Sequence, residues 1–290
     1  MNKSKEFLLK NIIFSTKVLN KNSKLEHVIN KSVFKFWEYK KDKDLECFLN
    51  SCNINPKEIL WIVTTNEEIA IANEYNISVL GYQNLNDISS MNEFLKCEYV
   101  VCGFDEVDDN YLENIYRRGH NIPLIIFETK RCIVREFALK DMDALWELYS
   151  DPEITEYIDD LFPYDEELEY ENKYIEHIYR YFGYGMWLVF HKETGKLIGR
   201  AGIESKDYQE GSEIEMGYVI AKEYQKKGYA TEVCQGIMEY AMNELNIKKI
   251  NCLIDKNNYP SIALAKKLGF KYDENCWNMG ENMQRYIYWG

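Results

Sequence analysis

Two lysines, a glycine and an alanine stand together before a predicted helix, in the stretch EYQKKGYATEVCQGI at 223–237. The first N–H groups of a helix have no partners within the helix, and the helix dipole places about half a positive charge there. Gly228 permits close backbone approach, and Ala230 leaves the first turn uncluttered. Lys226 and Lys227 add positive charge. The pattern predicts a diphosphate-binding site. An ordinary loop before an amphipathic helix, which can have a similar sequence, is the alternative.

Two carboxylates stand on the predicted strand that leads into this loop. Glu213 and Glu215 are two residues apart in SEIEMGYVI at 212–220, so a regular strand places both on one face. Glu215, which lies just before Gly217, is the better candidate for a general base that accepts a proton from a reacting group. Gly217 predicts a bulge or a close backbone approach within the strand. Exposed strand carboxylates with no chemical role remain the alternative.

Length and composition indicate an ordinary globular protein with room for two domains. The chain has 290 residues, of which 46% are hydrophobic and 29% charged, and its net charge is −13. This acidity argues against general nucleic-acid binding, which needs a basic surface. No apolar run approaches the roughly 20 residues that span a bilayer, and a secretory signal is not indicated. We expect a cytoplasmic protein that binds neither nucleic acid nor membrane, with its oligomeric state left open.

The eight cysteines are scattered, with no CxxC pair and no cluster of histidines nearby. This distribution predicts reduced, mostly packed thiols rather than a disulfide framework or a zinc site. We therefore expect no metal in the protein's chemistry.

Negative charge is concentrated in the second half of the chain. Residues 131–290 carry 19 basic and 29 acidic side chains, a balance of −10, whereas residues 1–130 have a balance of −3. Within residues 141–176 there are 14 acidic side chains and a single lysine, Lys173. A solvated helical face explains this run, and so does a site that attracts a cationic substrate.

The first half alternates short apolar runs with helical stretches, which predicts a parallel sheet covered by helices. The expected strands are 59–63, 77–82, 99–104 and 123–127, and the expected helices are 66–76 and 108–120. Gly119 suits the C-cap of the second helix. Residues 1–50 look mainly helical.

The second half combines a meander of strands with a strand–helix–strand crossover, which is an α+β organisation. The expected strands are 132–137, two within 186–205 joined by the turn KETGK, then 212–220, 249–254 and 283–289. The expected helices are 141–149, 165–182, 229 to about 246, and 261–270. We place the boundary near 128–131, which gives domains 1–130 and 131–290.

Three spaced motifs in this half carry a family resemblance. Gln225-x-x-Gly228-x-Ala230 resembles the Q/R-x-x-G-x-G/A signature of the GNAT superfamily of acyl-CoA N-acyltransferases. NYPSIALAKKLGF at 258–270 resembles the family's N-x-x-A/S…G-F helix, and the hairpin within 186–205 resembles its central hairpin. The hairpin and GYATE are most similar to the branch of ribosomal-protein N-terminal acetyltransferases. The resemblance implies a GNAT fold, a mixed central sheet with splayed strands, over residues 131–290.

The resemblance also implies a cosubstrate, acetyl-CoA, and the residues that hold it. Its pyrophosphate would lie against the loop and first helical turn, namely Gln225, Lys226, Lys227, Gly228, Tyr229, Ala230 and Thr231. The main chain of Tyr218, Val219 and Ile220 would pair with the pantetheine arm, and Asn258 would bond its amide.

One departure from the family concerns the group that protonates the leaving thiolate. Many members have a tyrosine seven residues after the motif asparagine, but this chain has Ala265 there. The resemblance implies Ser261 as the substitute, three residues after Asn258. Water is the alternative proton source, and a serine that satisfies the first turn of a helix has the same spacing.

The acceptor amine is expected to bind among aromatic side chains of residues 141–185 and just beyond. The candidates are Tyr170, Tyr174, Tyr181, Tyr184 and Trp187. Their acidic surroundings suit a small cationic amine or a peptide N-terminus, although tyrosines at helical spacing are also typical of a core.

The first half resembles a degenerate haloacid-dehalogenase-like hydrolase. LWIVTTNEEIAIANEYNISVLGY at 60–82 resembles the late motif of that family, a strand ending in G-D-S/T-x-x-D. Thr64 stands where the metal-binding aspartate belongs, Glu68 replaces the second aspartate, and the nucleophile motif is missing. We expect a degenerate Rossmann-like α/β domain without phosphatase activity. It would bind a regulator or an acceptor, or serve only as structure.

Direct acetyl transfer from acetyl-CoA to a primary amine, without a metal, is the function expected from these residues. The acceptor would be a small cationic molecule or a protein N-terminus. The alternative is a non-catalytic acyl-CoA sensor, because the loop fits both readings and the missing tyrosine favours the sensor.

Overall fold

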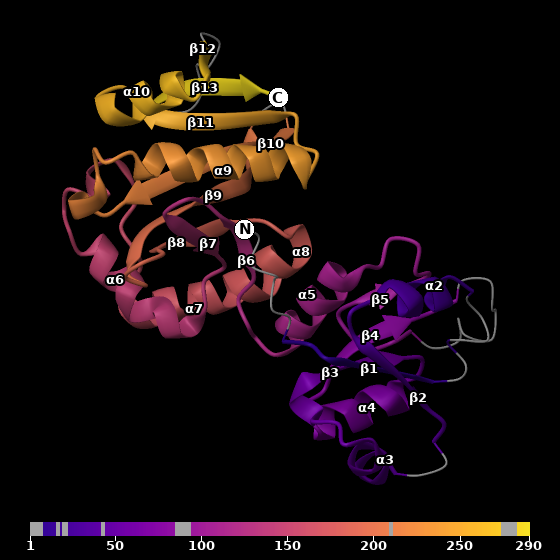
Figure 1. Cartoon of the computed structure of the whole chain (residues 1–290). Coiled ribbons are helices and arrows are strands. Elements are labelled where there is room, and N and C mark those ends of the chain that lie inside the picture. Colours follow the sequence, from indigo (N-terminus) through magenta and orange to yellow (C-terminus); the bar gives the residue numbers. More distant parts are fainter. Residues whose placement is uncertain are drawn as a thin grey trace. The chain divides into compact units, whose positions relative to one another are not determined.

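The computed structural model describes residues 8–15, 18, 23–41, 44–84, 94–208, 211–273 and 283–290. The chain divides into two compact units, Met1–Ile122 and Pro123–Gly290 (Figure 1). The division therefore falls several residues before the boundary expected from the sequence, near 128–131.

The first unit is built on a five-stranded sheet whose strands are all parallel, in the order β2-β1-β3-β4-β5. Its strands are β1 (Asn11–Ser15), β2 (Lys35–Tyr39), β3 (Ile59–Val63), β4 (Ser78–Tyr82) and β5 (Val100–Val101). Its helices are α2 (Ser23–Lys31), α3 (Leu45–Cys52), α4 (Asn66–Glu74) and α5 (Asp109–Gly119). The parallel sheet covered by helices was predicted. The expectation that residues 1–50 are mainly helical missed two strands, because the described part of this stretch contains β1 and β2 as well as α2 and the start of α3.

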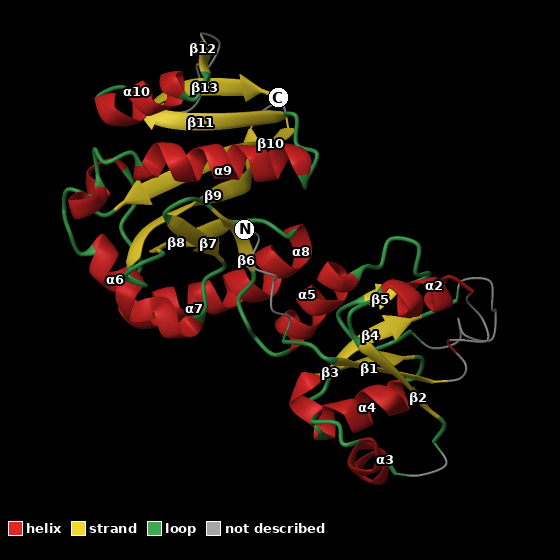
Figure 2. Ribbon diagram, in the orientation of Figure 1, coloured by secondary structure: helices red, strands yellow, loops and turns green. Residues whose placement is uncertain are grey.

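Helices cover both faces of this sheet, so the inner strands β1 and β3 are buried on both sides (Figure 2). Ile12 and Phe14 of β1 pack with residues of α2 and α5, whereas Ile13 packs with residues of α3 and α4. The alternation of neighbouring side chains between the two cores explains why these strands read as continuous apolar runs.

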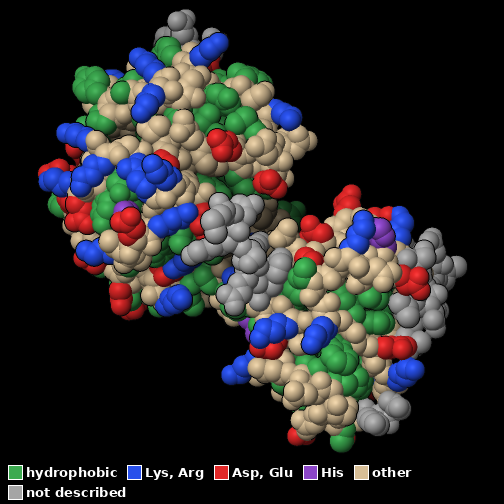
Figure 3. Space-filling model, viewed as in Figure 1, with side chains coloured by type: hydrophobic (Ala, Val, Ile, Leu, Met, Phe, Trp, Pro, Cys, Tyr) green, Lys and Arg blue, Asp and Glu red, His purple; other side chains and the backbone are tan. Residues whose placement is uncertain are grey.

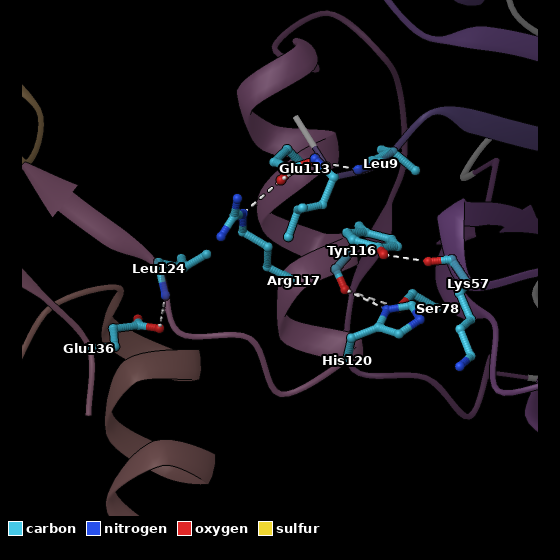
Figure 4. Close-up of polar contacts among 10 residues, drawn as sticks. Leu9, Lys57, Ser78, Glu113, Tyr116, Arg117, His120, Leu124 and Glu136 are labelled. Atoms are coloured by element: carbon cyan, nitrogen blue, oxygen red, sulfur yellow. Dashed lines mark hydrogen bonds and ion pairs between the residues drawn. The ribbon is translucent and has the colours of Figure 1, made fainter. Parts of the chain in front are cut away.

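Helix α5 is tied to the strands by buried polar contacts (Figure 4). The fully buried carboxylate of Glu113 accepts hydrogen bonds from the N–H of Leu9 at 2.9 Å and from Arg117 Nε at 2.7 Å. Gly119 is the last residue of the helix rather than its predicted C-cap, which is His120. A Cβ at Gly119 would collide with the side chain of Ser78 on β4, so glycine is needed there for close packing.

The second unit is built on a mixed eight-stranded sheet in the order β12-β13-β11-β10-β9-β8-β7-β6. Its strands are β6 (Ile125–Glu128), β7 (Cys132–Arg135), β8 (Met186–His191), β9 (Leu197–Tyr208), β10 (Gly211–Ile220), β11 (Lys249–Asp255), β12 (Lys271–Asp273) and β13 (Met283–Trp289). The pairing of β10 with β11 is parallel, and the other recorded pairings in this sheet are antiparallel. The predicted meander and strand–helix–strand crossover are confirmed.

Two groups of helices cover opposite faces of the second sheet (Figure 2). One face is covered by α6 (Met142–Tyr149), α7 (Tyr164–Lys173), the π-helical turn Tyr174–Tyr179 and α8 (Arg180–Phe182). The other is covered by α9 (Tyr229–Asn243) and α10 (Tyr259–Lys267). Along β9, alternate side chains therefore face the α7 side and the α9 side.

The strand predicted at 123–127 belongs to this second sheet, not to the parallel sheet of the first unit. It forms β6, which pairs antiparallel with β7. The adjoining main-chain N–H of Leu124 donates to the carboxylate of Glu136 at 3.0 Å, within the same unit (Figure 4). A short apolar strand near a domain boundary has the same composition whichever sheet it joins. The sequence pattern therefore predicted the strand but not its sheet.

Among the residues that the structure describes, no helix is long and apolar enough to cross a membrane.

Candidate active site

A cavity of about 410 Å³ opens in the second unit where β10, α9 and α10 meet. Ten of the residues predicted to hold the cosubstrate line it: Tyr218, Val219, Ile220, Gln225, Lys226, Gly228, Ala230, Thr231, Asn258 and Ser261. The loop that follows α6 lines it as well, with Glu153, Ile154 and residues 156–158. Within the predicted set, the structure brings Tyr218 and Ser261 into contact although they are 43 positions apart in the sequence.

The cavity exists because β10 and β11 part. Their parallel register consists of one pair, Glu215 opposite Asn251, and no pairing between these strands is recorded after it. On its other edge β10 stays paired with β9 as far as Ile220, and no register shift occurs at Gly217. The bulge expected at Gly217 is therefore absent from this pairing. The separation of the strands leaves the cavity-facing edge of residues 218–220 without a β11 partner within the described chain.

The loop before α9 has two residues in the left-handed region of backbone conformation, Lys226 with φ 56° and Gly228 with φ +85°. Gly228 is the N-cap of α9, and its carbonyl accepts the N–H of Glu232 at 3.1 Å. The three N–H groups that come first in the helix have no earlier turn of the helix to accept them. Gln225 anchors the loop, because its side-chain Nε2 donates to the carbonyl of Ile220 at 2.9 Å.

Arg131 supports this loop from outside the cavity, and no sequence pattern predicted this role. Its main-chain N–H and its Nε each donate to the carboxylate of Glu232 at 2.7 Å. Its Nη1 donates to the carbonyl of Lys227 at 3.0 Å, and its guanidinium lies 4.0 Å from the ring centre of Tyr229. These contacts fix the first turn of α9. In the view of Figure 3, Lys and Arg side chains gather on the side of this unit where α9 begins.

Two predicted cosubstrate residues, Lys227 and Tyr229, do not line the cavity. The Tyr229 side chain is buried, and its hydroxyl lies 3.0 Å from Nε2 of His191. The Lys227 ammonium lies 5.8 Å from the ring centre of Tyr224. Their side chains therefore contact neighbours of the loop rather than the cavity.

Asn258 and Ser261 lie at the start of α10, on the opposite wall from the α9 loop. Asn258 is the N-cap of α10, and its side-chain oxygen accepts the N–H of Ser261 at 3.2 Å. Ser261 is half-buried and lines the cavity. Ala265, where the family often has a tyrosine, is buried in the core. The Tyr218 hydroxyl lies 3.5 Å from the carbonyl of Ser261, and burial raises the pKa of this phenol.

Glu215 and Glu213 both face the α7 side of the sheet, but their surroundings differ. Three side chains of neighbouring strands donate to the Glu213 carboxylate: Lys249 at 2.5 Å, Asn251 at 2.6 Å and Arg285 at 2.5 Å. Burial raises the pKa of Glu213, but these partners outweigh it and the pKa lies below its usual value. Glu213 is thus a fixed anion that joins three strands, and Glu215 remains the candidate base.

A further carboxylate, Glu204, lies directly opposite Glu215 on β9. The hydroxyl of Tyr174 donates to Glu204 Oε1 at 2.5 Å and accepts the N–H of Met186 at 2.8 Å. Lys206 Nζ lies 2.9 Å from Glu204 Oε2. Sequence reasoning missed Glu204, because the register between β9 and β10 is the only signal that pairs it with Glu215.

The five aromatic residues predicted around the acceptor have different surroundings. Tyr170 and Tyr174 lie together, with ring centres 6.0 Å apart. Tyr181 is 83% exposed, and Tyr184 is half-buried. Trp187 is fully buried and packs against Tyr240 of α9 and against Phe127, on the other face of the sheet. Its assignment to the acceptor pocket was therefore wrong.

Beneath these groups lies a buried ion pair between Arg200 of β9 and Glu171 of α7. Arg200 Nη2 is 2.6 Å from Glu171 Oε1, and the two side chains are 8% and 0% exposed. Burial raises the pKa of Glu171 in spite of the arginine. The pair fixes α7 to the sheet four residues before Glu204 on β9.

The part of the chain that the structure describes contains no group of three or more His, Cys, Asp or Glu side chains arranged to hold a metal ion.

Comparisons with known proteins agree with this geometry. Residues 131–271 match the family described as acetyltransferase (GNAT) domain. An uncharacterized N-acetyltransferase of Bacillus licheniformis, p20, is 30% identical over 145 residues, which are 49% of this chain and 80% of that protein. YnaD of Bacillus subtilis, another uncharacterized N-acetyltransferase, is 33% identical over 144 residues, 49% of this chain and 81% of that protein.

A third relative has a named substrate. Spermidine N(1)-acetyltransferase of Escherichia coli is 37% identical over 59 residues, which are 20% of this chain and 32% of that protein. The matches to p20 and YnaD each cover most of the relative, and with the family match they support an enzyme of the acyltransferase class. Through its second unit, the chain belongs to the GNAT family of acetyltransferases, which use acetyl-CoA.

Proposed function

We propose that the protein transfers the acetyl group of acetyl-CoA directly to a primary amine, with the cavity at β10, α9 and α10 as the cosubstrate site. The observation that carries the proposal is the meeting of the α9 N-terminus with two parted strands at one cavity. The diphosphate would lie against the first N–H groups of α9, where the helix dipole favours negative charge. The exposed Lys226 would add its charge there.

The pantetheine arm would run along the edge of β10 that β11 leaves open. The main chain of Tyr218, Val219 and Ile220 would pair with it as a further strand would. Asn258 already uses its side-chain oxygen as a helix cap, so its side-chain NH₂ group is the part left to donate to the arm. Gln225 contributes by holding the loop to Ile220.

Glu215 would take the proton that the amine must lose before attack. A lysine-like amine with a pKa near 10.4 costs about 4.6 kcal/mol to deprotonate at pH 7, whereas an α-amine near 7.8 costs about 1 kcal/mol. A base therefore matters most for an alkylamine. Glu215 lies two residues from Gly217 and four from Val219, so it is near the end of the cavity and on the same face of the strand.

Ser261 would protonate the leaving thiolate. It lines the cavity at the start of α10. Its main-chain N–H donates to the Asn258 side chain, so the Ser261 hydroxyl is not needed as a helix cap. The carbonyl group of the thioester would sit between Gly217 and Ser261, near the N–H groups of β10. In this arrangement the bond from carbon to sulfur breaks as the bond from carbon to nitrogen forms.

The acceptor would be a small cationic amine or a protein N-terminus. The 14 acidic side chains within residues 141–176 favour a cation by long-range attraction. The relation to spermidine N(1)-acetyltransferase, although it covers only a short segment, supports a small molecule rather than a protein N-terminus as the acceptor.

For the first unit we propose a degenerate Rossmann-like domain, related to haloacid-dehalogenase-like hydrolases, without phosphatase activity. Its strand order, 2-1-3-4-5, is one of the two common doubly wound orders. The N–H and the hydroxyl of Thr64 donate to the Glu68 carboxylate, and Lys41 Nζ lies 3.5 Å from it. These contacts occupy Glu68 as a structural anion and so disfavour it as a metal ligand.

We also propose that the protein works in the cytoplasm. The described cysteines are all free thiols, a state that a reducing compartment maintains.

Release of CoA in the presence of an amine panel tests the proposed reaction. The panel contains alkylamines, diamines, aminoglycosides and peptides with free N-termini. Turnover with one of these classes is expected, and Glu215→Gln should lower it most at low pH while leaving CoA affinity unchanged. A protein that binds CoA but acetylates none of them would contradict the proposal. An unchanged pH profile in the variant would remove Glu215 as the base.

A further inference from the structure

Two carboxylates face each other across β9 and β10 beside the cavity. Glu204 and Glu215 are direct partners in the antiparallel register, so their side chains stand on the same face of the sheet. Cβ atoms of such partners are about 4.5–5.5 Å apart. A single amine needs one carboxylate as its base, which leaves the second carboxylate to be explained.

Glu204 is held as an anion by neighbours on both of its oxygens. The Tyr174 hydroxyl accepts the N–H of Met186, so its own proton points to Glu204 Oε1. The Lys206 ammonium lies against Oε2. Burial raises the pKa of Glu204, but the hydrogen bonds from Lys206 and Tyr174 lower it by more. The pKa of Glu204 therefore lies below its usual value. A carboxylate of this kind is a poor proton acceptor and a good partner for a cation.

The site beside Glu204 is reachable and has an aromatic wall. The Glu204 side chain is 21% exposed, and the side chain of Lys206 that covers it is 51% exposed. The ring of Tyr170 lies 6.0 Å from that of Tyr174 and 5.6 Å from that of Phe162. Tyr170 and Phe162 are 44% and 52% exposed. Aromatic faces attract cations, and the effect is stronger where water is partly excluded.

Glu215 stands three residues before Tyr218, the first residue of β10 that lines the cavity. Gly217 separates Glu215 from the cavity-lining residues of β10, and a Cβ at Gly217 would lie 3.6 Å from Met186 Sδ. Met186 is the residue whose N–H fixes the Tyr174 hydroxyl. The Cβ atoms of direct cross-strand partners are about 4.5–5.5 Å apart, so an amine at Glu215 is within a few carbon atoms of Glu204.

We propose that Glu204, oriented by Tyr174 and flanked by the Tyr170 ring, binds a second, permanent cation of the acceptor. The proposal rests on the proposed acetyl transfer, in which Glu215 receives the reacting amine. The preferred acceptors are then molecules with two cationic groups a few carbons apart, such as diamines. The Lys206 ammonium occupies the position of the second cation and moves away from Glu204 when the substrate binds. Glu204 contacts the substrate, and Tyr174 is a positioning residue that acts through Glu204.

A pair of acceptors that differ in one charge tests the subsite: 1,4-diaminobutane and 1-aminopentane. Glu204→Gln should lower kcat/KM for the diamine by at least about tenfold, mainly through KM, and change the monoamine by less than about twofold. Tyr174→Phe should change the same ratio in the same direction by a smaller factor. Equal losses on both acceptors in Glu204→Gln, or no loss, would overturn the proposal.

Two variants serve as matched controls. Glu239→Gln removes an exposed carboxylate on α9, on the other face of the sheet, and should leave the ratio unchanged. Tyr272→Phe removes the hydroxyl of a tyrosine on β12 that is 51% exposed and should also leave it unchanged. Lys206→Gln should lower the KM for the diamine, because it removes the competing ammonium, and a raised KM would count against the subsite.

Calorimetric titration of 1,4-diaminobutane into the CoA-loaded protein separates the subsite from the reaction. Weaker diamine binding in Glu204→Gln than in the wild type supports the subsite even if the wild type acetylates no amine. In that case only the proposed acetyl transfer is overturned. Equal diamine binding by both proteins overturns the subsite, whatever the turnover shows.

Discussion

The backbone of Gly228 offers the sharpest test of the loop before α9. Its φ of +85° lies in the left-handed region, and a Cβ there would only reach ordinary contact with Arg131, 3.5 Å away. Gly228→Ala therefore adds backbone strain without a collision. A non-glycine residue in the left-handed helical region costs about 1–2 kcal/mol. If the loop relaxes to relieve this strain, the first amides of α9 move and the Kd for CoA rises by about 5- to 30-fold.

Gly228→Glu adds a charge to the same strain. A carboxylate about 5 Å from a phosphate charge repels it by about 3 kcal/mol at an effective dielectric constant of 20. Together the two effects predict a Kd for CoA raised more than about a hundredfold. Isothermal titration calorimetry with CoA measures both variants, and differential scanning calorimetry measures their Tm.

Gly195 provides the matched control for this series. It also has a left-handed φ, +68°, and a Cβ there would have nothing within 4 Å. Gly195→Ala should lower the Tm by about the same few degrees as Gly228→Ala while leaving the Kd for CoA unchanged. Wild-type CoA affinity in Gly228→Glu would refute the assignment of the loop. A loss of affinity in Gly195→Ala equal to that in Gly228→Ala would refute the reasoning from local strain.

Three further predictions concern the surroundings of the site. Arg131→Met removes the bond to the Lys227 carbonyl and should raise the Kd for CoA by about 10- to 150-fold by calorimetry, since a hydrogen bond from a charged group contributes about 1.5–3 kcal/mol; an unchanged Kd would show that the first turn of α9 holds its shape alone. Arg200→Met leaves Glu171 as an unpaired buried carboxylate and should cost about 3–5 kcal/mol. In a unit of this size that lowers the Tm by roughly 6–20 °C, and a smaller drop in Arg200→Met/Glu171→Leu than in the single variant is expected; equal drops would count against the ion pair. The folded-state pKa of Glu213 lies below its unfolded value of about 4.3, so its stabilisation is present above that pH and is lost as the pH falls through the folded pKa. Glu213→Gln should therefore lose less stability than the wild type when urea unfolding is compared at pH 7 and pH 3, and parallel losses would contradict this account.

Much of the site could be predicted because its residues are close in sequence. The run from Gln225 to Thr231 combines a loop, a left-handed glycine and a helix start, all of which are local features. Its pairing with Asn258 and Ser261 needed a family resemblance, because no local pattern relates residues of separate helices. The predicted elements meet at one cavity, but the side chains of Lys227 and Tyr229 do not line it. The Gln225 side chain donates to the Ile220 carbonyl, and the Tyr229 hydroxyl lies against His191, so both side chains support the loop.

Contacts between distant segments could not be predicted from this sequence. Arg131 meets the carbonyl of Lys227 across 96 residues of chain, and nothing in its local pattern marks that partner. Glu204 acquires its role from the strand register, where a shift of one residue would move it to the other face. Trp187 was misassigned for the same reason, since an alternating strand does not reveal which face meets which helix.

The first unit shows the limit set by short strands. NIIFS and KFWEY are five residues each, which is too short for periodicity to distinguish a buried strand from a helical segment. From β3 onward the alternation of strands and helices was long enough to predict the parallel sheet. The run at 123–127 was identified as a strand correctly, but its sheet depends on β7, which follows it.

A crystal structure of the protein soaked with CoA measures the central claim most directly. The account predicts the diphosphate within hydrogen-bond distance of the first main-chain N–H groups of α9, and the pantetheine arm along residues 218–220 between β10 and β11. CoA bound in the first unit, or bound in the second unit away from the Gly228 loop, would contradict it.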